Sequence, residues 1–140
     1  HVINYSKDDF VGAVKDITGG KGVRAVYDSV GKDTYPGSLQ VLQDCGHFIA
    51  FGQSSGLITD FKLADLAANG SLYAQRPTLA TYIASNAHLA EMAQNLFSML
   101  GAGKIKASVN QRYSLADTAE AFRALTGRET TGVTLIETGL

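Results

Sequence analysis

Two short apolar runs, each followed by a turn of small and polar residues, constrain the fold of this chain most. The first run covers residues 23–27 and ends in a turn at 28–31; the second covers 48–51 and ends in a turn at 52–56. Apolar runs bounded by glycine are typical of strands in a parallel sheet that is covered on both faces. Since ligands of such folds lie beyond the carboxyl ends of the strands, both turns are expected at one functional edge.

Helical and strand patterns alternate along the rest of the chain. Parallel strands need a crossover, and a helix at 36–45 can supply it, with Leu39, Leu42 and Cys45 on one face and Gly46 ending it. Ser6 and Asp9 have capping-box spacing, as have Ser114 and Asp117. The other expected elements are strands at 2–5, 71–75, 105–113 and 132–136, and helices at 10–17, 63–67 (capped by Asp60), 81–100 and 119–125 (closed by Gly127).

Composition excludes several classes of function. The net charge of −1 gives no electrostatic basis for binding nucleic acid or an anionic membrane. No apolar run approaches the roughly 20 residues that cross a bilayer. The single cysteine, Cys45, rules out an internal disulfide, fits a reducing compartment and is expected to pack on its helix. Because His1 already stands in a strand-like run, we expect the chain to be a fragment of a longer polypeptide.

The common catalytic motifs are missing from the sequence. The three histidines, His1, His47 and His88, do not have metal-ligand spacing, so we expect no metal site. There is no G-x-S-x-G elbow, which argues against Ser54 as a nucleophile, and no Walker loop. The glycines at 19–22 end a helix and precede a strand, so they are not a phosphate-binding G-x-G-x-x-G loop. No residue stands out as catalytic.

Five segments together carry a family resemblance. HVINY, VYDSVGKDTY, FIAFGQSSG, SLYAQRPTLATYI and RETTGVTLIE stand in this order and span nearly the whole chain. They closely resemble the carboxyl-terminal part of the zinc-free quinone oxidoreductases, the zeta-crystallin-like branch of the medium-chain dehydrogenase/reductase superfamily.

The resemblance implies an α/β fold: a partial Rossmann domain, which is a doubly wound parallel sheet, lacking its first strands. Residues 1–80 would be the remainder of this NADP-binding domain, and residues 81–140 a helix and a returning strand-helix-strand segment of the substrate domain. With the first two strands missing, the strand at 2–5 is expected to pair directly with that at 23–27 or to be poorly ordered.

The resemblance also implies an activity. Intact family members transfer hydride from NADPH to a quinone or another α,β-unsaturated carbonyl compound without zinc; the fragment alone is expected to be inactive. It further implies a cytoplasmic homodimer formed through the strand between Ser71 and Gln75. Two alternatives stay open: a related zinc-free enoyl reductase, and a non-enzymatic crystallin-like or RNA-binding protein.

Cofactor contacts follow from the resemblance position by position. They are Tyr5 near the adenosine phosphate; Ser29, Val30 and Gly31 beneath the cofactor; Phe51, Gly52, Gln53 and Ser54 along the nicotinamide ribose; Pro77, Thr78 and Leu79 at the nicotinamide; and Arg128 from the returning segment. Small residues let the backbone approach a flat ligand, and a guanidinium suits phosphate. Gly31 and Gly52 as simple turn formers, and Arg128 as an exposed helix-end charge, remain alternatives.

Overall fold

The structure, a computed structural model, describes residues 1–139 and divides into two compact units. The first unit is His1–Tyr82 and the second begins at Ile83. Among the described residues, no helix combines the length and apolar character that crossing a membrane requires.

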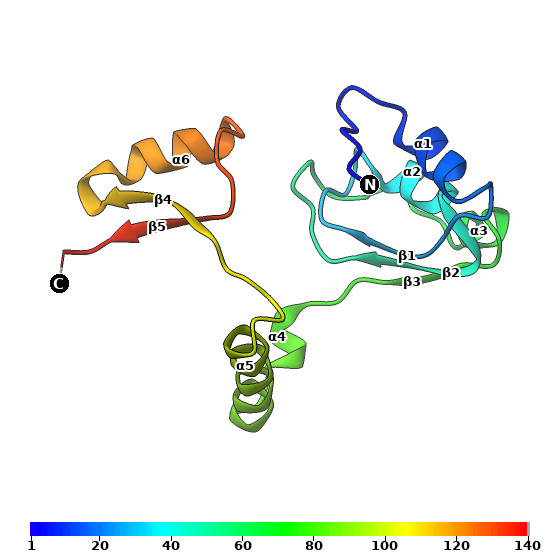
Figure 1. Cartoon of the computed structure of the whole chain (residues 1–140). Helices are drawn as coiled ribbons and strands as arrows, with labels where there is room; N and C mark the ends of the chain where they lie inside the picture. The colour runs from blue at the N-terminus through cyan, green and yellow to red at the C-terminus, as the bar shows by residue number, and fades with distance from the viewer. Residues whose placement is uncertain (140) are drawn as a thin grey trace. The chain divides into compact units, whose positions relative to one another are not determined.

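The first unit is built on a three-stranded parallel sheet (Figure 1). Its strands lie in the order β1 (Val23–Asp28), β2 (Leu42–Ala50) and β3 (Tyr73–Gln75). Its helices are α1 (Phe10–Ile17), α2 (Tyr35–Gln40), α3 (Leu63–Ala68) and α4 (Leu79–Tyr82). Helix α2 connects β1 to β2, and α3 connects β2 to β3. The predicted α/β fold with a parallel sheet is therefore confirmed.

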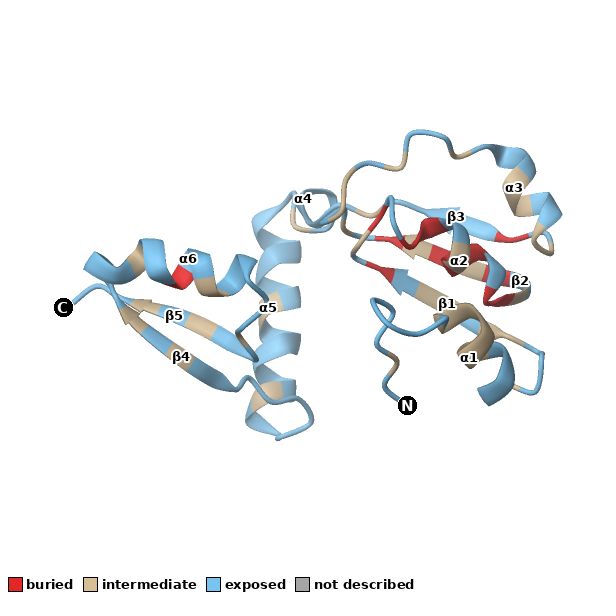
Figure 2. Ribbon diagram, turned by 90° about the horizontal axis from the view of Figure 1, so that it is seen from above, coloured by how far each residue is buried: buried red, intermediate tan, exposed pale blue. Residues whose placement is uncertain are grey.

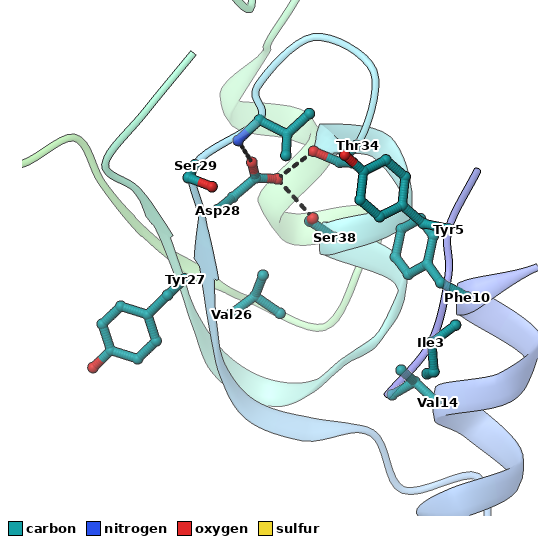
Figure 3. Close-up of a pocket in the computed structure, with 11 residues that line it drawn as sticks. Ile3, Tyr5, Phe10, Val14, Val26, Tyr27, Asp28, Ser29, Thr34 and Ser38 are labelled. Atoms are coloured by element: carbon teal, nitrogen blue, oxygen red, sulfur yellow. Dashed lines mark hydrogen bonds between the residues drawn. The ribbon is translucent and has the colours of Figure 1, made fainter. Parts of the chain in front are cut away.

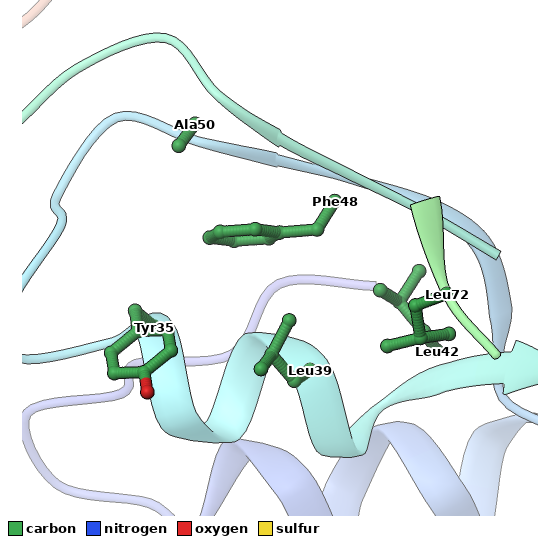
Figure 4. Packing of buried hydrophobic residues seen from close by; sticks show 6 residues of the cluster. All are labelled: Tyr35, Leu39, Leu42, Phe48, Ala50 and Leu72. Carbon is green, nitrogen blue, oxygen red and sulfur yellow. The ribbon is translucent and has the colours of Figure 1, made fainter. Parts of the chain in front are cut away.

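The hydrophobic core lies between α2 and the sheet, where the buried residues of Figure 2 gather. Figure 4 shows its members, which are Tyr35, Leu39, Leu42, Phe48, Ala50 and Leu72. The opposite face of the sheet is different. It carries Tyr27 and Tyr73, which are 70% and 59% exposed, and the Tyr73 ring stacks on His47 at a centroid distance of 5.0 Å. The expected cover on both faces is thus not provided within residues 1–82.

The predicted strand at 2–5 is wrong. The segment forms no strand and does not pair with β1; Val2 is fully exposed, while Ile3 and Tyr5 line a pocket beside α1 and β1. A strand needs a hydrogen-bonding neighbour, so an apolar run without a partner strand does not adopt the structure that its pattern favours.

The predicted helix at 36–45 ends early. Helix α2 stops at Gln40, and Leu42 begins β2 instead of continuing the helical face. Cys45 has a left-handed backbone (φ 56°), donates its amide proton to the Gly70 carbonyl (2.8 Å) and is exposed, so its expected packing role is wrong. Over so few residues, apolar spacing fits the end of a helix and the start of a strand equally well.

Two predicted helix caps of the first unit are also wrong. Asp9, not Ser6, caps α1, because its carboxylate accepts hydrogen bonds from the amides of Val11 and Gly12. At α3 the N-cap residue is Lys62 rather than Asp60, and the Asp65 carboxylate accepts from the Lys62 amide at 2.9 Å. In both places a carboxylate at the helix start satisfies amides that the helix itself leaves free.

The second unit contains α5 (Asn86–Gly101), β4 (Val109–Ser114), the 3₁₀ turn η1 (Leu115–Asp117), α6 (Thr118–Thr126) and β5 (Val133–Glu137). Strands β4 and β5 pair in parallel. The predicted helix at 81–100 is divided into α4 and α5, and Ser85 caps α5 by accepting from the His88 amide. Gly127 follows α6 as expected, but Ser114 donates to the Asp117 side chain at 2.6 Å instead of forming a capping box.

Candidate functional site

The two predicted turns lie against each other at the carboxyl edge of the sheet, as expected. Backbone hydrogen bonds run from the amides of Phe51 and Gly52 to the Asp28 carbonyl, and from those of Ser54 and Ser55 to the carbonyls of Ser29 and Val30. The Ser55 hydroxyl also donates to the Val30 carbonyl at 2.8 Å. We call residues 28–34 and 51–56 together the loop pair.

Gly31 and Gly52 allow the loops of this pair to approach closely. Gly31 has φ 92°, and a Cβ atom placed on it would lie 2.6 Å from the Gly56 carbonyl oxygen. A Cβ atom on Gly52 would lie 2.5 Å from the Ser29 carbonyl oxygen. A side chain at either position would therefore collide with the backbone of the other loop.

The Asp28 side chain holds the first loop in place by hydrogen bonds (Figure 3). The side chain is only 4% exposed; Oδ1 accepts from the amides of Val30 (2.8 Å) and Gly31 (2.9 Å), and Oδ2 accepts from the hydroxyls of Thr34 and Ser38 (both 2.8 Å). Burial by itself would raise the pKa of the Asp28 carboxyl, but these hydrogen bonds outweigh it and hold the pKa below its ordinary value. Asp28 is therefore ionised at neutral pH.

A first pocket, of about 250 Å³, opens beside the Asp28 loop. Three predicted site residues, Tyr5, Ser29 and Val30, line it (Figure 3). The rest of its lining consists of apolar side chains, mainly of α1 and β1, and of the polar side chains of Asp28, Thr34 and Ser38. Tyr5 is 45% exposed, which leaves much of its ring accessible.

A second pocket, of about 380 Å³, lies at the carboxyl ends of β2 and β3. Gly52 and Gln53 line it together with Arg76, and most of its other lining is apolar, including Phe48 and Phe61. The Arg76 guanidinium donates to the Pro77 carbonyl (2.9 Å) and to Gln53 Oε1 (3.4 Å). These two bonds connect the segment after β3 with the second loop.

The remaining predicted residues occupy several positions. Phe51 is 52% exposed, and Ser54 is exposed on the same loop. Thr78 pairs with the Thr81 hydroxyl, and Leu79, 66% exposed, begins α4. Arg128 belongs to the second unit, where it follows α6 with an exposed side chain and a left-handed backbone (φ 58°).

Three residues that shape the site, Asp28, Ser55 and Arg76, were not expected from the sequence. Asp28 carried a recognisable signal. An aspartate at the end of a strand and the start of a turn can accept a hydrogen bond from the amide two residues further on, which closes an Asx-turn. The partners of Ser55 and Arg76 are distant in sequence, so no local spacing could have identified them. Within residues 1–139, no three or more His, Cys, Asp or Glu side chains are grouped so that they could hold a metal ion.

Comparisons with known proteins extend over nearly the whole chain. The family model described as zinc-binding dehydrogenase matches residues 1–136. A quinone oxidoreductase of Salmonella typhimurium is 48% identical over 137 residues, covering 96% of this chain and 42% of that protein. A 2-haloacrylate reductase of a Burkholderia species is 41% identical over 133 residues, covering 94% of this chain and 40% of that protein.

Solved structures agree with these relatives. The crystal structure of the Escherichia coli quinone oxidoreductase complexed with NADPH matches with a TM-score of 0.92 and 45% identity, covering 99% of this chain and 43% of that one. The chain thus spans about two fifths of the length of these relatives. It belongs to the zinc-binding dehydrogenase family, and its likeness within that family is to the quinone oxidoreductases.

Proposed function

We propose that this chain forms part of an NADPH-dependent oxidoreductase that transfers hydride to a quinone or another α,β-unsaturated carbonyl compound without zinc. The observation that carries the proposal is the loop pair, which gathers residues 29–31 and 51–54 at the carboxyl edge of a parallel sheet. Support comes from the quinone oxidoreductases among the matched relatives, one of which was solved in complex with NADPH.

The donors and acceptors at this edge suit a nicotinamide nucleotide. Ser29, Gln53 and Ser54 are exposed there and offer hydroxyl and amide groups for ribose hydroxyls. Arg76 engages Gln53 Oε1, which orients the Gln53 side chain and leaves its amide protons for a ligand. When bound, NADPH would supply the hydride, and the chain's own residues would hold and orient it.

The proposal also assigns roles to the parts of the chain. Residues 1–80 would belong to the NADP-binding domain and residues 81–140 to the substrate domain, with Arg128 reaching the cofactor. Tyr5 would lie near the adenosine phosphate, and Pro77, Thr78 and Leu79 at the nicotinamide. A cytoplasmic location is part of the proposal, because a single unpaired cysteine suits a reducing compartment.

A steady-state assay tests the activity. The natural gene product that carries this sequence is expected to oxidise NADPH when a benzoquinone or naphthoquinone is added, and to retain this activity after dialysis against a metal chelator. The loss of nicotinamide absorbance measures the rate. A protein that binds NADPH but reduces only enoyl thioesters would favour the enoyl reductase alternative. A protein that binds no NADPH but retards RNA in a gel at low salt would favour the non-enzymatic one.

A second class of acceptor, α,β-unsaturated carboxylates, is favoured by Arg76. It is the one cation among the residues lining the second pocket, and it stands beside apolar side chains that would contact a carbon skeleton. The 2-haloacrylate reductase among the relatives makes this class worth including in the assay. The rates of NADPH oxidation with an acrylate derivative and with a quinone, measured side by side, would show which class of acceptor the protein reduces.

We further propose that the chain forms a homodimer through the edge of β3, between Ser71 and Gln75. Within residues 1–139, strand β3 pairs with β2 alone, so its other edge offers free backbone groups to a second copy. Replacing Tyr73 with lysine is expected to give a monomer, because a charged edge disfavours strand pairing and Tyr73 is 59% exposed. Light scattering measures the mass.

The neighbouring residue Leu72 would not serve for this test. It is 6% exposed and belongs to the core, so its substitution would also destabilise the first unit. A matched control is Tyr27→Lys, which changes an exposed tyrosine of the same sheet in β1 instead of β3 and should leave the dimer intact. A dimer that persists in the Tyr73 variant would contradict this mode of assembly.

A further inference from the structure

Asp28 is a buried charged group to which the proposed function assigns no part. Its carboxylate accepts four hydrogen bonds, two from backbone amides of the first loop and two from hydroxyls at and within α2. Bonds to an ionised acceptor are about twice as strong as neutral ones. The side chain therefore ties the first loop to the helix that packs on the core.

The first loop in turn positions the second. The carbonyl groups of Asp28, Ser29 and Val30 are the backbone acceptors for the amides of residues 51, 52, 54 and 55. The Ser55 hydroxyl accepts from the Asp33 amide at 3.0 Å and donates to the Val30 carbonyl, which adds side-chain bonds between the loops. A displacement of residues 29–31 would consequently displace Gln53 and Ser54.

We propose that Asp28 is a positioning residue for cofactor binding: it holds residues 29–31, and through them residues 51–54, in the arrangement that receives the nicotinamide half of NADPH. This inference rests on the proposed function. Asp28 is only 4% exposed and both of its carboxylate oxygens are taken up by hydrogen bonds, so its effect is exerted through the groups that its carboxylate fixes.

The energetics predict a graded response to substitution. Asp28→Ala removes all four bonds and leaves the amides of Val30 and Gly31 without their acceptor. Asp28→Asn keeps a carbonyl oxygen for those amides but loses the charge. Ser38→Ala removes a single bond from α2 and leaves the loop sequence unchanged.

Titration of the gene product with NADPH tests the inference. The dissociation constant is expected to rise about tenfold in Asp28→Ala and a few-fold in Asp28→Asn and Ser38→Ala. The KM for NADPH should rise with it while kcat with saturating NADPH changes less, because positioning acts on binding. Partial recovery in the Asn variant would identify the acceptor oxygen as the important feature.

Asp65→Asn is the matched control. The Asp65 carboxylate likewise accepts from a backbone amide, that of Lys62, and from the Tyr35 hydroxyl (3.2 Å), but these two bonds do not involve the loop pair. This variant should lose stability and keep its affinity for NADPH. Hydrogen exchange provides a second readout that needs no cofactor: amides of residues 51–55 should exchange faster in Asp28→Asn and not in Asp65→Asn.

The outcomes separate the inference from the proposed function. If the unmodified protein binds no NADPH, the proposed function fails, and cofactor positioning fails with it. If the unmodified protein binds NADPH and both Asp28→Asn and Ser38→Ala bind equally well, the positioning role of Asp28 is wrong and the proposed function stands. Asp28→Ala need not fold for this distinction to be made.

Discussion

Replacing Gly31 with alanine is expected to lower the free energy of unfolding of the first unit by about 3 kcal/mol. Two costs combine at this position. The residue has φ 92°, where a side chain strains the backbone, and the new Cβ atom would lie 2.6 Å from the Gly56 carbonyl oxygen and 3.1 Å from Gln53 Cα. Both neighbours are backbone atoms of the second loop, so relief requires the loop pair to separate. Urea unfolding followed by far-ultraviolet circular dichroism would measure the loss.

Gly20→Ala is the control for this prediction. Gly20 also has a left-handed backbone (φ 80°), but a Cβ atom there would meet nothing within 4 Å. Only the backbone strain remains, about 1 kcal/mol, and the stiffer unfolded chain offsets part of it. If the two variants were equally destabilised, loop contact would not be the reason for the glycine at position 31.

The parts of the fold that sequence could predict are those set by local pattern. The runs that became β1, β2 and β3 are bounded by glycine or proline, and the stripe of α1 repeats at helical spacing, so chain-local chemistry defines these elements. The carboxyl edge followed from the same reasoning, since both turns come after parallel strands. The amides of residues 51, 52, 54 and 55 then join the two turns, as expected for turns at one edge.

Other features depend on partners that a local pattern does not reveal. Residues 2–5 have a strand pattern, but they do not pair with the open edge of β1. Leu42 is buried as the first residue of β2, and it would be buried equally well on the apolar face of a helix. Arg76 becomes part of the site only because β3 ends next to the second loop. In each place tertiary structure decides between alternatives that the sequence leaves equal.

Replacing Leu39 with alanine is expected to cost about 3 kcal/mol of unfolding free energy, within the range of 2–5 kcal/mol typical of buried leucines. Leu39 is 3% exposed on α2 and packs in the cluster with Leu42 and Phe48 (Figure 4). The first unit has a small core in which no side chain is less than 2% exposed, so few other contacts compensate for a cavity at its centre. Since stabilities of single domains are about 5–15 kcal/mol, such a loss is a large part of the total.

Leu63→Ala is the control for Leu39→Ala, because it makes the same substitution at an exposed position. Leu63 begins α3 and is 80% exposed, so its truncation should change the unfolding free energy by about 0.5 kcal/mol or less. Chemical denaturation of both variants under identical conditions gives the difference. Because Asp28 is held by Ser38, the neighbour of Leu39 on α2, the Leu39 variant should also loosen the loop pair and expose the amides of residues 51–55 to faster exchange. Equal stability of the two variants would mean that α2 is not packed on the sheet as described, and the support that the core gives to the functional edge would be lost with it.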